Sequence, residues 1–146
     1  MIRISCIVAL AACACGCATS SDLIPIDYQF LDHPEESRIE LVYRNDTDYG
    51  VCLLPEAWPD SRGRIAGASQ ILVLVIGNKG FPVTAEGGFW GHCDPVAACL
   101  IHVGPGESIS VSIPYSSFTI PEDLLGMPKE LDLRVFGQRC PRGRTR

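Results

Sequence analysis

The chain of 146 residues has no apolar run long enough to cross a bilayer as a helix. The N-terminal run, from Ile4 to Ala14, is far shorter than the roughly 20 residues that such a helix needs. Gly, Ser and Asp follow this run, so there is no stop-transfer segment either. Heptads and internal repeats are also absent, which argues against a coiled coil or a repeat array.

Enzyme signatures are missing from the sequence. It contains no GxSxG nucleophile elbow, no P-loop and no HExxH motif, and neither Ser116 nor Ser117 has a histidine or carboxylate beside it. Three loop carboxylates are candidates for a sugar-cleaving pair, although solvation beside packed aromatics explains them better: Glu56, Asp60 and Glu86. We therefore expect no enzymatic activity and no cofactor, and we name no catalytic residue.

Positive charge is scarce, with 12 Lys and Arg against 17 Asp and Glu, for a net charge of -5. A net acidic domain binds nucleic acid poorly, so we expect no nucleic-acid partner. The charge is uneven, because the last eight residues hold four arginines and no acid. We expect the basic tail, residues 141–146, to be solvated, the alternative being contact with anionic headgroups or lipopolysaccharide phosphates.

The first twenty residues carry the most information about where the protein goes. Arg3 precedes the apolar run, and small residues interleaved with cysteine follow it, as in a secretory signal. With cysteine at the cleavage point, the stretch resembles a bacterial lipoprotein signal, in which a cysteine is diacylated and becomes the new N-terminus. The alternative is an ordinary cleaved signal that releases a soluble periplasmic protein.

Three cysteines compete for the lipid. Cys17 fits the length of the apolar segment best, and cleavage before it leaves no spare thiol in an oxidising compartment. Cys13 follows a better lipobox, Leu10-Ala11-Ala12, but would leave two spare thiols, and Cys15 is the third candidate. None of the three is followed by Asp. The resemblance therefore implies the outer membrane, with the protein anchored by its lipid and facing the periplasm.

Composition divides the chain into four parts. The segment from Ser20 to Ser37 is acidic and turn-rich, with Pro25 and Pro34, and is typical of a tether. The rest has the length of one domain. We predict a lipoprotein signal peptide at 1–16, a lipidated N-terminus and tether at 17–37, a β-sandwich domain at 38–140 and the basic tail at 141–146.

Only four of the eight cysteines remain in the predicted domain, which indicates two disulfides in an oxidising compartment. Cys93 and Cys99 flank a five-residue loop, so a local bridge between them is the simplest choice. Cys52 would then pair with Cys140 and clip the start of the domain to its end, a closure of about 4 kcal/mol in the chain-entropy model. Pairing of Cys52 with Cys93 or Cys99 is the alternative.

Alternating apolar and polar residues predict a series of short strands. Residues 38–44 and 49–54 are expected to form a hairpin, because Asn45 to Asp48 is a typical turn. The run Ile71 to Ile76 is expected to be buried on both faces, with 81–84 as its partner. Further strands are expected at 99–103, 108–115 and 130–136, with Pro114 at a sheet edge and at most one helical turn at 121–128.

About seven short strands and two disulfides predict an all-β fold, a small antiparallel β-sandwich with long loops. The strand, Asn-Asp turn and strand, together with the later Pro-Gly-Glu turn, are loosely similar to immunoglobulin-like modules of bacterial envelope proteins. That resemblance implies a fold and no activity. A small closed β-barrel is the alternative architecture.

One cluster has the residue types of a zinc or copper site: His92, Cys93, Asp94, Cys99 and His102. The oxidising compartment favours a disulfide between the same sulfurs, so we expect no metal. His92 and His102 are the weak candidates for a metal site. In the alternative function, a metal-binding envelope protein or a metal-dependent hydrolase would use these two histidines.

The preferred function is a non-catalytic binding module, because aromatic side chains on braced loops give rigid contact area. The predicted binding residues are Trp58, Phe89, Trp90 and His92. The alternative is that Trp58 and Trp90 merely plug the core. The expected partner, besides the membrane reached through the lipid, is another envelope protein or a glycan. An inhibitor of a cell-wall hydrolase, or an immunity protein against a delivered one, is a concrete form of this function.

Overall fold

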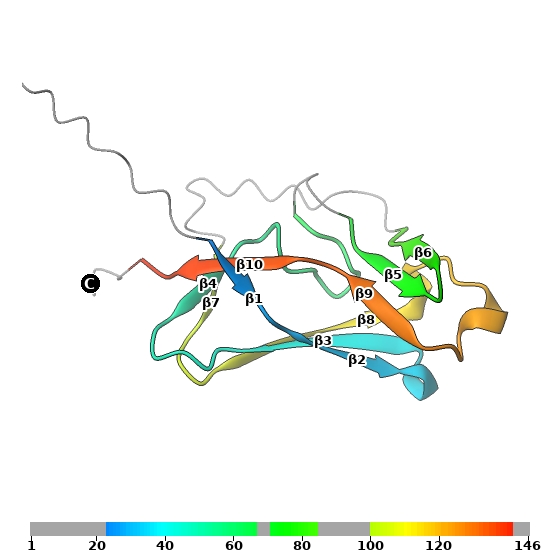
Figure 1. Cartoon of the computed structure of the whole chain (residues 1–146), viewed down its shortest axis with the longest axis horizontal. Helices are drawn as coiled ribbons and strands as arrows, with labels where there is room; N and C mark the ends of the chain where they lie inside the picture. Colours follow the sequence, from blue (N-terminus) through cyan, green and yellow to red (C-terminus); the bar gives the residue numbers. More distant parts are fainter. Residues whose placement is uncertain (1–22, 67–70, 85–99, 142–146) are drawn as a thin grey trace, which may run out of the picture.

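Antiparallel β-strands in two layers enclose the core of the protein (Figure 1). The structure is a computed structural model that describes residues 23–66, 71–84 and 100–141. Among these residues, no helix is long and apolar enough to cross a membrane. The strands are β1 (Ile24–Ile26), β2 (Gln29–His33), β3 (Arg38–Arg44), β4 (Val51–Leu53), β5 (Val73–Ile76), β6 (Lys79–Pro82), β7 (Ile101–Val103), β8 (Ser108–Pro114), β9 (Lys129–Asp132) and β10 (Val135–Arg139). Single 3-10 turns are η1 (Pro34–Glu36), η3 (Tyr115–Ser117) and η4 (Glu122–Leu124).

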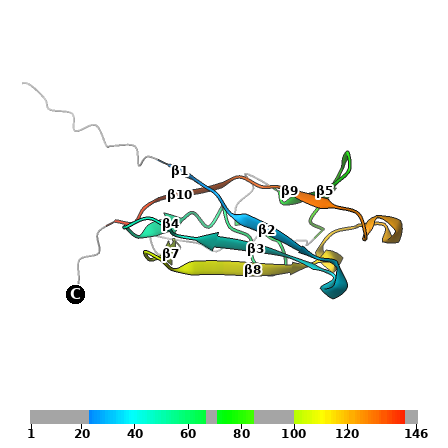
Figure 2. The same cartoon turned by 60° about the horizontal axis from the view of Figure 1, so that its bottom comes forward.

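The described strands form three sheets, in the orders β1-β10-β4-β7, β6-β5-β9 and β2-β3-β8. The strands β9 and β10 run one after the other along one layer, and β2-β3-β8 forms the layer opposite (Figures 1 and 2). Within the described part of the chain, the sheets are not closed into a barrel. The predicted all-β sandwich is therefore confirmed, and the barrel alternative is wrong.

The predicted hairpin of residues 38–44 with 49–54 is wrong, although both strands exist. The first of them, β3, pairs with β2 and β8, whereas β4 pairs with β10 and β7 in the other layer. The side chain of Asn45 explains the crossing, because its Nδ2 donates to the carbonyl oxygen of Val103 in β7 at 2.9 Å. The turn thus fastens the end of one sheet to the other and leads the chain across.

The predicted tether is too long, because the domain begins near Ile24 and not at Arg38. The strand β1 pairs with β10, with Ile24 opposite Gly137, and β2 pairs with β3 over its whole length. Ile26 is buried in the core. Short strands with a proline resemble a linker in sequence, but pairing with longer strands gives them a place in the sheets.

Two further strand predictions need correction. Residues 130–136 are not one strand: β9 and β10 belong to different sheets, and the buried Leu133 lies between them. Residues 71–76 are not buried on both faces either, because β5 alternates between the buried Leu74 and Ile76 and the half-exposed Val73 and Val75. Its partner β6 begins two residues earlier than expected, directly after the Gly77-Asn78 turn.

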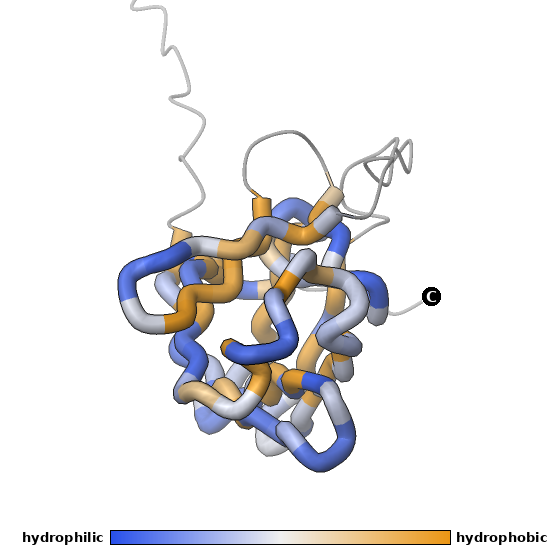
Figure 3. Tube along the Cα trace, turned by 90° about the vertical axis from the view of Figure 1, so that its right-hand side faces the viewer, coloured by the Kyte–Doolittle hydropathy of each residue, from blue (hydrophilic) through white to orange (hydrophobic). Residues whose placement is uncertain are grey.

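Inward-facing side chains of both layers build one core. In β3 the buried residues alternate with partly exposed ones, and the same period is seen in β8, as half-buried sheets require. Figure 3 looks along the domain from the η4 end, where the turns are mostly hydrophilic and the strands carry the hydrophobic residues. The most deeply buried side chains are Ile39, Leu41, Val51, Leu53, Leu72, Leu74, Val103, Ile113 and Asn45.

The long connection after β4 is held by Asp60. Its carboxylate accepts hydrogen bonds from the backbone N–H groups of Arg62 and Arg64 and pairs with the Arg64 guanidinium at 2.6 Å. Burial raises the pKa of this carboxyl, but the bonds from the two arginines outweigh burial and hold the pKa below its usual value. Gly63 follows with φ of +77°, where a Cβ atom would lie 2.8 Å from Val83 Cγ2. Asp60 therefore has a structural role in this loop.

A buried lysine joins the two layers at the η4 end of the domain. The Lys129 side chain is 1% exposed, and its Nζ contacts Asp32 Oδ2 at 3.1 Å. The same Nζ donates to the carbonyl oxygens of Leu125 and Met127, at 2.6 and 3.1 Å. The Tyr115 hydroxyl donates to the other oxygen of Asp32, and Lys129 Nζ lies 4.6 Å from the centroid of the Tyr115 ring. Burial, together with the bond to Asp32, raises the pKa of Tyr115, so the phenol stays protonated.

Candidate functional site: the hollow beside the disulfide

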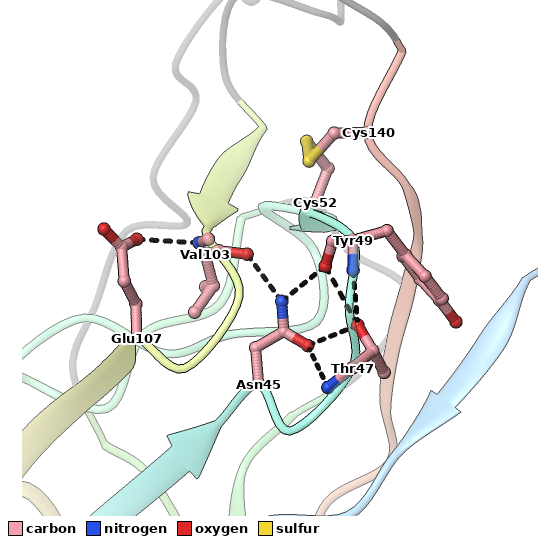
Figure 4. Close-up of a disulfide and its surroundings, with 8 residues drawn as sticks. Asn45, Thr47, Tyr49, Cys52, Val103, Glu107 and Cys140 are labelled. Carbon is pink, nitrogen blue, oxygen red and sulfur yellow. Dashed lines mark hydrogen bonds between the residues drawn. A yellow bond between two sulfur atoms is a disulfide. The ribbon is translucent and has the colours of Figure 1, made fainter.

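The disulfide joins Cys52 and Cys140 at the end of the sandwich opposite η4, with their Cα atoms 4.9 Å apart (Figure 4). Cys52 lies in β4, and Cys140 directly follows β10. This pairing was predicted from the sequence and is confirmed. The strand β4 lies between β10 and β7, and in β7 the residue directly opposite Cys52 is His102. His102 is exposed, as expected for an outward position in this strand.

The buried side chain of Asn45 fixes the β3–β4 connection, which lies at the same end of the sandwich as the disulfide (Figure 4). Its Nδ2 donates to the carbonyl oxygens of Tyr49 and Val103, at 2.8 and 2.9 Å. Its Oδ1 accepts from the backbone N–H of Thr47 and from the Thr47 hydroxyl, at 3.1 and 2.7 Å. Because Asn45 is completely buried, these four bonds replace the water that its amide would otherwise bind. They hold Tyr49 in a defined place.

The β7–β8 turn is fastened to the same asparagine. The backbone N–H of Asn45 donates to the carbonyl oxygen of Glu107 at 2.9 Å, and the N–H of Gly106 donates to the carbonyl oxygen of Asn45 at 2.8 Å. The Glu107 carboxylate closes the turn by accepting the N–H of Gly104 at 2.7 Å. Two connections, each of which crosses from one layer to the other, are thereby locked to each other around one residue.

A hollow of about 420 Å³ lies beside the disulfide at this end. Its lining residues are Asp48, Tyr49, Gly50, His102, Arg139, Cys140 and Pro141. The Arg139 guanidinium is stacked on the Tyr49 ring, 4.1 Å from the ring centroid. Stacking of this kind orients the guanidinium and leaves its edge N–H groups free to donate.

Gly50 allows the imidazole and the disulfide to approach the chain closely. A Cβ atom at this position would lie 3.0 Å from Nε2 of His102 and 3.5 Å from Sγ of Cys140. The carbonyl oxygen of Gly50 also accepts the backbone N–H of Cys140 at 2.9 Å. A larger residue would make a tight contact with the His102 ring, which would have to shift by a few tenths of an ångström, so glycine lets the ring lie this close to the chain.

The groups in the hollow suit binding of a polar, anionic partner group. Arg139 brings an oriented cation and Tyr49 an aromatic face, while Asp48 adds a single carboxylate. Within the part of the chain that the structure describes, no hydrogen bond orients the His102 ring as a catalytic base would require. No group of three possible metal ligands occurs among the described residues, and the two sulfurs beside His102 are bonded to each other.

A second hollow, of about 490 Å³, is lined by residues of the β1–β2 connection and of the adjoining parts of β2, β3 and β8. Its lining residues are Asp27, Tyr28, Gln29, Val42, Arg44, Asp46 and Ser108. Here the lining arginine, Arg44, already bonds through Nε to Oδ1 of Asp46 at 2.9 Å, and Asp27 adds a second carboxylate. The first hollow is therefore the better candidate for an anionic group.

The predicted binding residues are only partly placed by the structure. Trp58 is 7% exposed and belongs to the core, so it offers no contact surface, and the alternative that it plugs the core is correct for this residue. Several predicted residues lie outside the described residues: the lipidation candidates Cys13, Cys15 and Cys17, the predicted pair Cys93 and Cys99, and Phe89, Trp90, His92 and Glu86. Because His92 is among them, the expectation that His92 and His102 hold no metal stays a prediction.

Sequence reasoning missed the two residues that define the hollow, Tyr49 and Arg139. A signal was present, since each lies close to one of the two cysteines of the predicted bridge. Once Cys52 and Cys140 are paired, residues flanking them must come together, and an arginine near an aromatic residue is a common stacked pair.

Comparison with known proteins gives no further assignment: no protein-family model, no curated protein and no solved structure matches this chain.

Proposed function

We propose that the protein is a bacterial outer-membrane lipoprotein, acylated at Cys17, whose β-sandwich faces the periplasm and acts as a non-catalytic binding module. The signal-like N-terminus supports the anchor, since an apolar run, small residues and cysteine occur there in the order that lipoprotein signals require. The grouping of Arg139 with Tyr49 supports a role in binding.

The pairing of β1 with β10 is the observation that carries this proposal. It places Ile24 opposite Gly137, three residues from Cys140, at the disulfide end of the sandwich. Ile24 lies seven positions after Cys17, a distance of about 25 Å at full extension. A lipid on Cys17 would hold the disulfide end, and the hollow with it, close to the membrane surface.

The proposed partner is another envelope protein or a glycan that presents a carboxylate or phosphate near the membrane. Arg139 would receive this group, and Tyr49 keeps the guanidinium oriented for it. Inhibition of a cell-wall hydrolase, including immunity against a delivered enzyme, is one form of this function. The proposal assigns no chemical step to the protein.

A photo-crosslinking residue at Asp48, in the full-length chain in its own envelope, is expected to capture a discrete partner. The same residue at Glu122, which is exposed at the opposite end, is the control position. Replacing Arg139 with glutamine is expected to weaken capture by about tenfold or more, because a charge-assisted hydrogen bond is lost. The matched variant is Arg62→Gln, at an exposed loop arginine outside the hollow.

Capture at Asp48 that is equal to capture at Glu122 would contradict the placement of the binding site. Equal capture by the Arg139→Gln and Arg62→Gln variants would contradict the role of the arginine. Mass spectrometry of the captured product distinguishes a protein from a glycan.

A further inference from the structure

The edge strand β8 is long, pairs with β3 without a bulge and has one unpaired side among the described strands. It pairs with β3 from Ser108 to Pro114 and with no other strand among the described residues. Figure 2 shows it along the border of its sheet. The outward-facing side chains along it are small, with Ser108, Ser110 and Ser112 all exposed.

The register determines which backbone groups of β8 are free. Two hydrogen bonds flank the β3–β8 ladder in the same register: Tyr115 N–H donates to Ser37 O, and Asn45 N–H donates to Glu107 O. The backbone N–H and C=O groups of the odd-numbered residues of β8 therefore point toward β3. Hydrogen-bonded and non-bonded pairs alternate along an antiparallel ladder. The N–H and C=O groups of Ser108, Ser110 and Ser112 therefore point away from β3, toward the open edge.

This edge lacks the features that usually prevent strands from pairing with another chain. Natural edge strands are protected by charge, proline, bulges or shortness. The other edge strands of the described sheets carry such protection: β1 and β7 have three residues each, β2 has Asp32 and His33, β6 has Lys79 and Pro82, and β9 has Lys129, Glu130 and Asp132. The strand β8 ends in Pro114, but its first six residues, Ser108 to Ile113, have no charge and no proline.

We propose that β8 pairs with β8 of a second copy of this chain around a twofold axis at Ser110. Ser110 then lies opposite Ser110 of the other copy, and Ser108 lies opposite Ser112. Each of these opposed serine pairs exchanges two backbone hydrogen bonds, which satisfies all the free N–H groups of the strand. The two three-stranded sheets become one continuous sheet, and the twofold axis closes the assembly as a dimer.

The side chains of β8 fit this occupant on both faces. On the inner face, Ile109 comes opposite Val111 of the other copy, and both are only half-buried in the single chain although they pack against its core. On the outer face, serine meets serine, and no like charges are brought together. The charged residues Arg38, Glu40 and Arg44 lie one strand further in, on β3, and of these Arg38 reaches β8 by donating from Nη1 to Ser112 Oγ at 3.4 Å.

A cysteine placed on the proposed axis tests the pairing directly. Opposed residues of a hydrogen-bonded antiparallel pair have Cα atoms about 5.5 Å apart, a distance that a disulfide spans. The full-length Ser110→Cys protein is expected to give a covalent dimer on a non-reducing gel, sensitive to reductant and absent from the unsubstituted protein. The control is Ser116→Cys, at an exposed serine outside β8.

The register is tested by mixing two variants. Ser108→Cys and Ser112→Cys copies are expected to cross-link when mixed and not when each is alone, because each is offset from its own counterpart by about 14 Å. Ser110→Lys, which opposes two ammonium groups on the axis, is expected to shift the sedimenting species to monomer. No dimer with Ser110→Cys, or equal dimer with Ser116→Cys, overturns the proposal. Retention of the dimer in Ser110→Lys also overturns it.

Discussion

Replacing Asp32 with leucine is expected to lower the free energy of unfolding by about 3–5 kcal/mol, because the substitution leaves the Lys129 ammonium buried without its counter-ion. Lys129 is 1% exposed on its side chain, so water cannot replace the lost carboxylate. Against a total stability of about 5–15 kcal/mol, this loss is a large fraction. Urea titration of the purified protein with its disulfide intact measures it.

Removing the other partner of the ion pair with Lys129→Met is expected to lower the free energy of unfolding by less. The remaining Asp32 is 23% exposed on its side chain and keeps the Tyr115 hydroxyl as a donor. In the double variant the buried charge is removed altogether, and stability is expected to recover by about 1 kcal/mol or more relative to Asp32→Leu alone. The matched control is Asp123→Leu, at an exposed aspartate in η4. If Asp32→Leu costs no more than Asp123→Leu, the buried pair does not join the layers as described.

Removing the disulfide with the variant Cys52→Ala/Cys140→Ala is expected to cost about 4 kcal/mol. The bridge closes a loop between residues 88 positions apart, which restricts the unfolded chain strongly in the chain-entropy model. Alanine is the appropriate replacement because Cys52 is buried. Denaturant titrations of the two proteins give the difference, and reductant added to the unsubstituted protein gives a second measurement.

The variant Cys93→Ala/Cys99→Ala provides the comparison, since the predicted bridge between these residues closes a short loop. Its expected cost is about 2 kcal/mol on the same scale, clearly less than that of the long bridge. Equal stability of the Cys52→Ala/Cys140→Ala variant and the unsubstituted protein would mean that the two ends of the domain are held together without the disulfide.

The strands and one disulfide were predictable because the strands follow from alternation within a short segment and the disulfide from the number and spacing of the cysteines. The alternation in Arg38–Arg44 and Ser108–Pro114 gave both strands and their buried faces. The predicted domain has four cysteines, and the short loop between Cys93 and Cys99 favours a bridge between those two, so Cys52 was expected to pair with Cys140. In each case the pattern needs no knowledge of the rest of the fold.

Strand partners were harder to predict because they depend on distant residues. A turn such as Asn45 to Asp48 is compatible both with a hairpin and with a crossing to the other layer. The carbonyl oxygen of Val103, 58 positions away, decides between the two outcomes. The short strand β1 likewise exists only because β10 is there to pair with it.

The candidate site could be predicted only in part, for the same physical reason. His102 was recognised by its residue type, but Arg139 gains its meaning from the ring of Tyr49 beneath it. Trp58 is predicted as a contact residue because an aromatic side chain on a braced loop gives rigid contact area, yet its side chain is buried in the core. The buried ion pair of Lys129 with Asp32 had no local signal, since it joins strands from opposite layers.

The anchor at Cys17 is the central claim of this account, and the mass of the mature N-terminal peptide tests it most directly. Mass spectrometry of protein extracted from membranes is expected to find a peptide that begins at Cys17 and carries a diacylglyceryl group. A lipidated peptide that begins at Cys13 or Cys15 would preserve the anchor and contradict the choice of cysteine. An unmodified N-terminus, in protein released from the envelope without detergent, would contradict the membrane-anchored function itself.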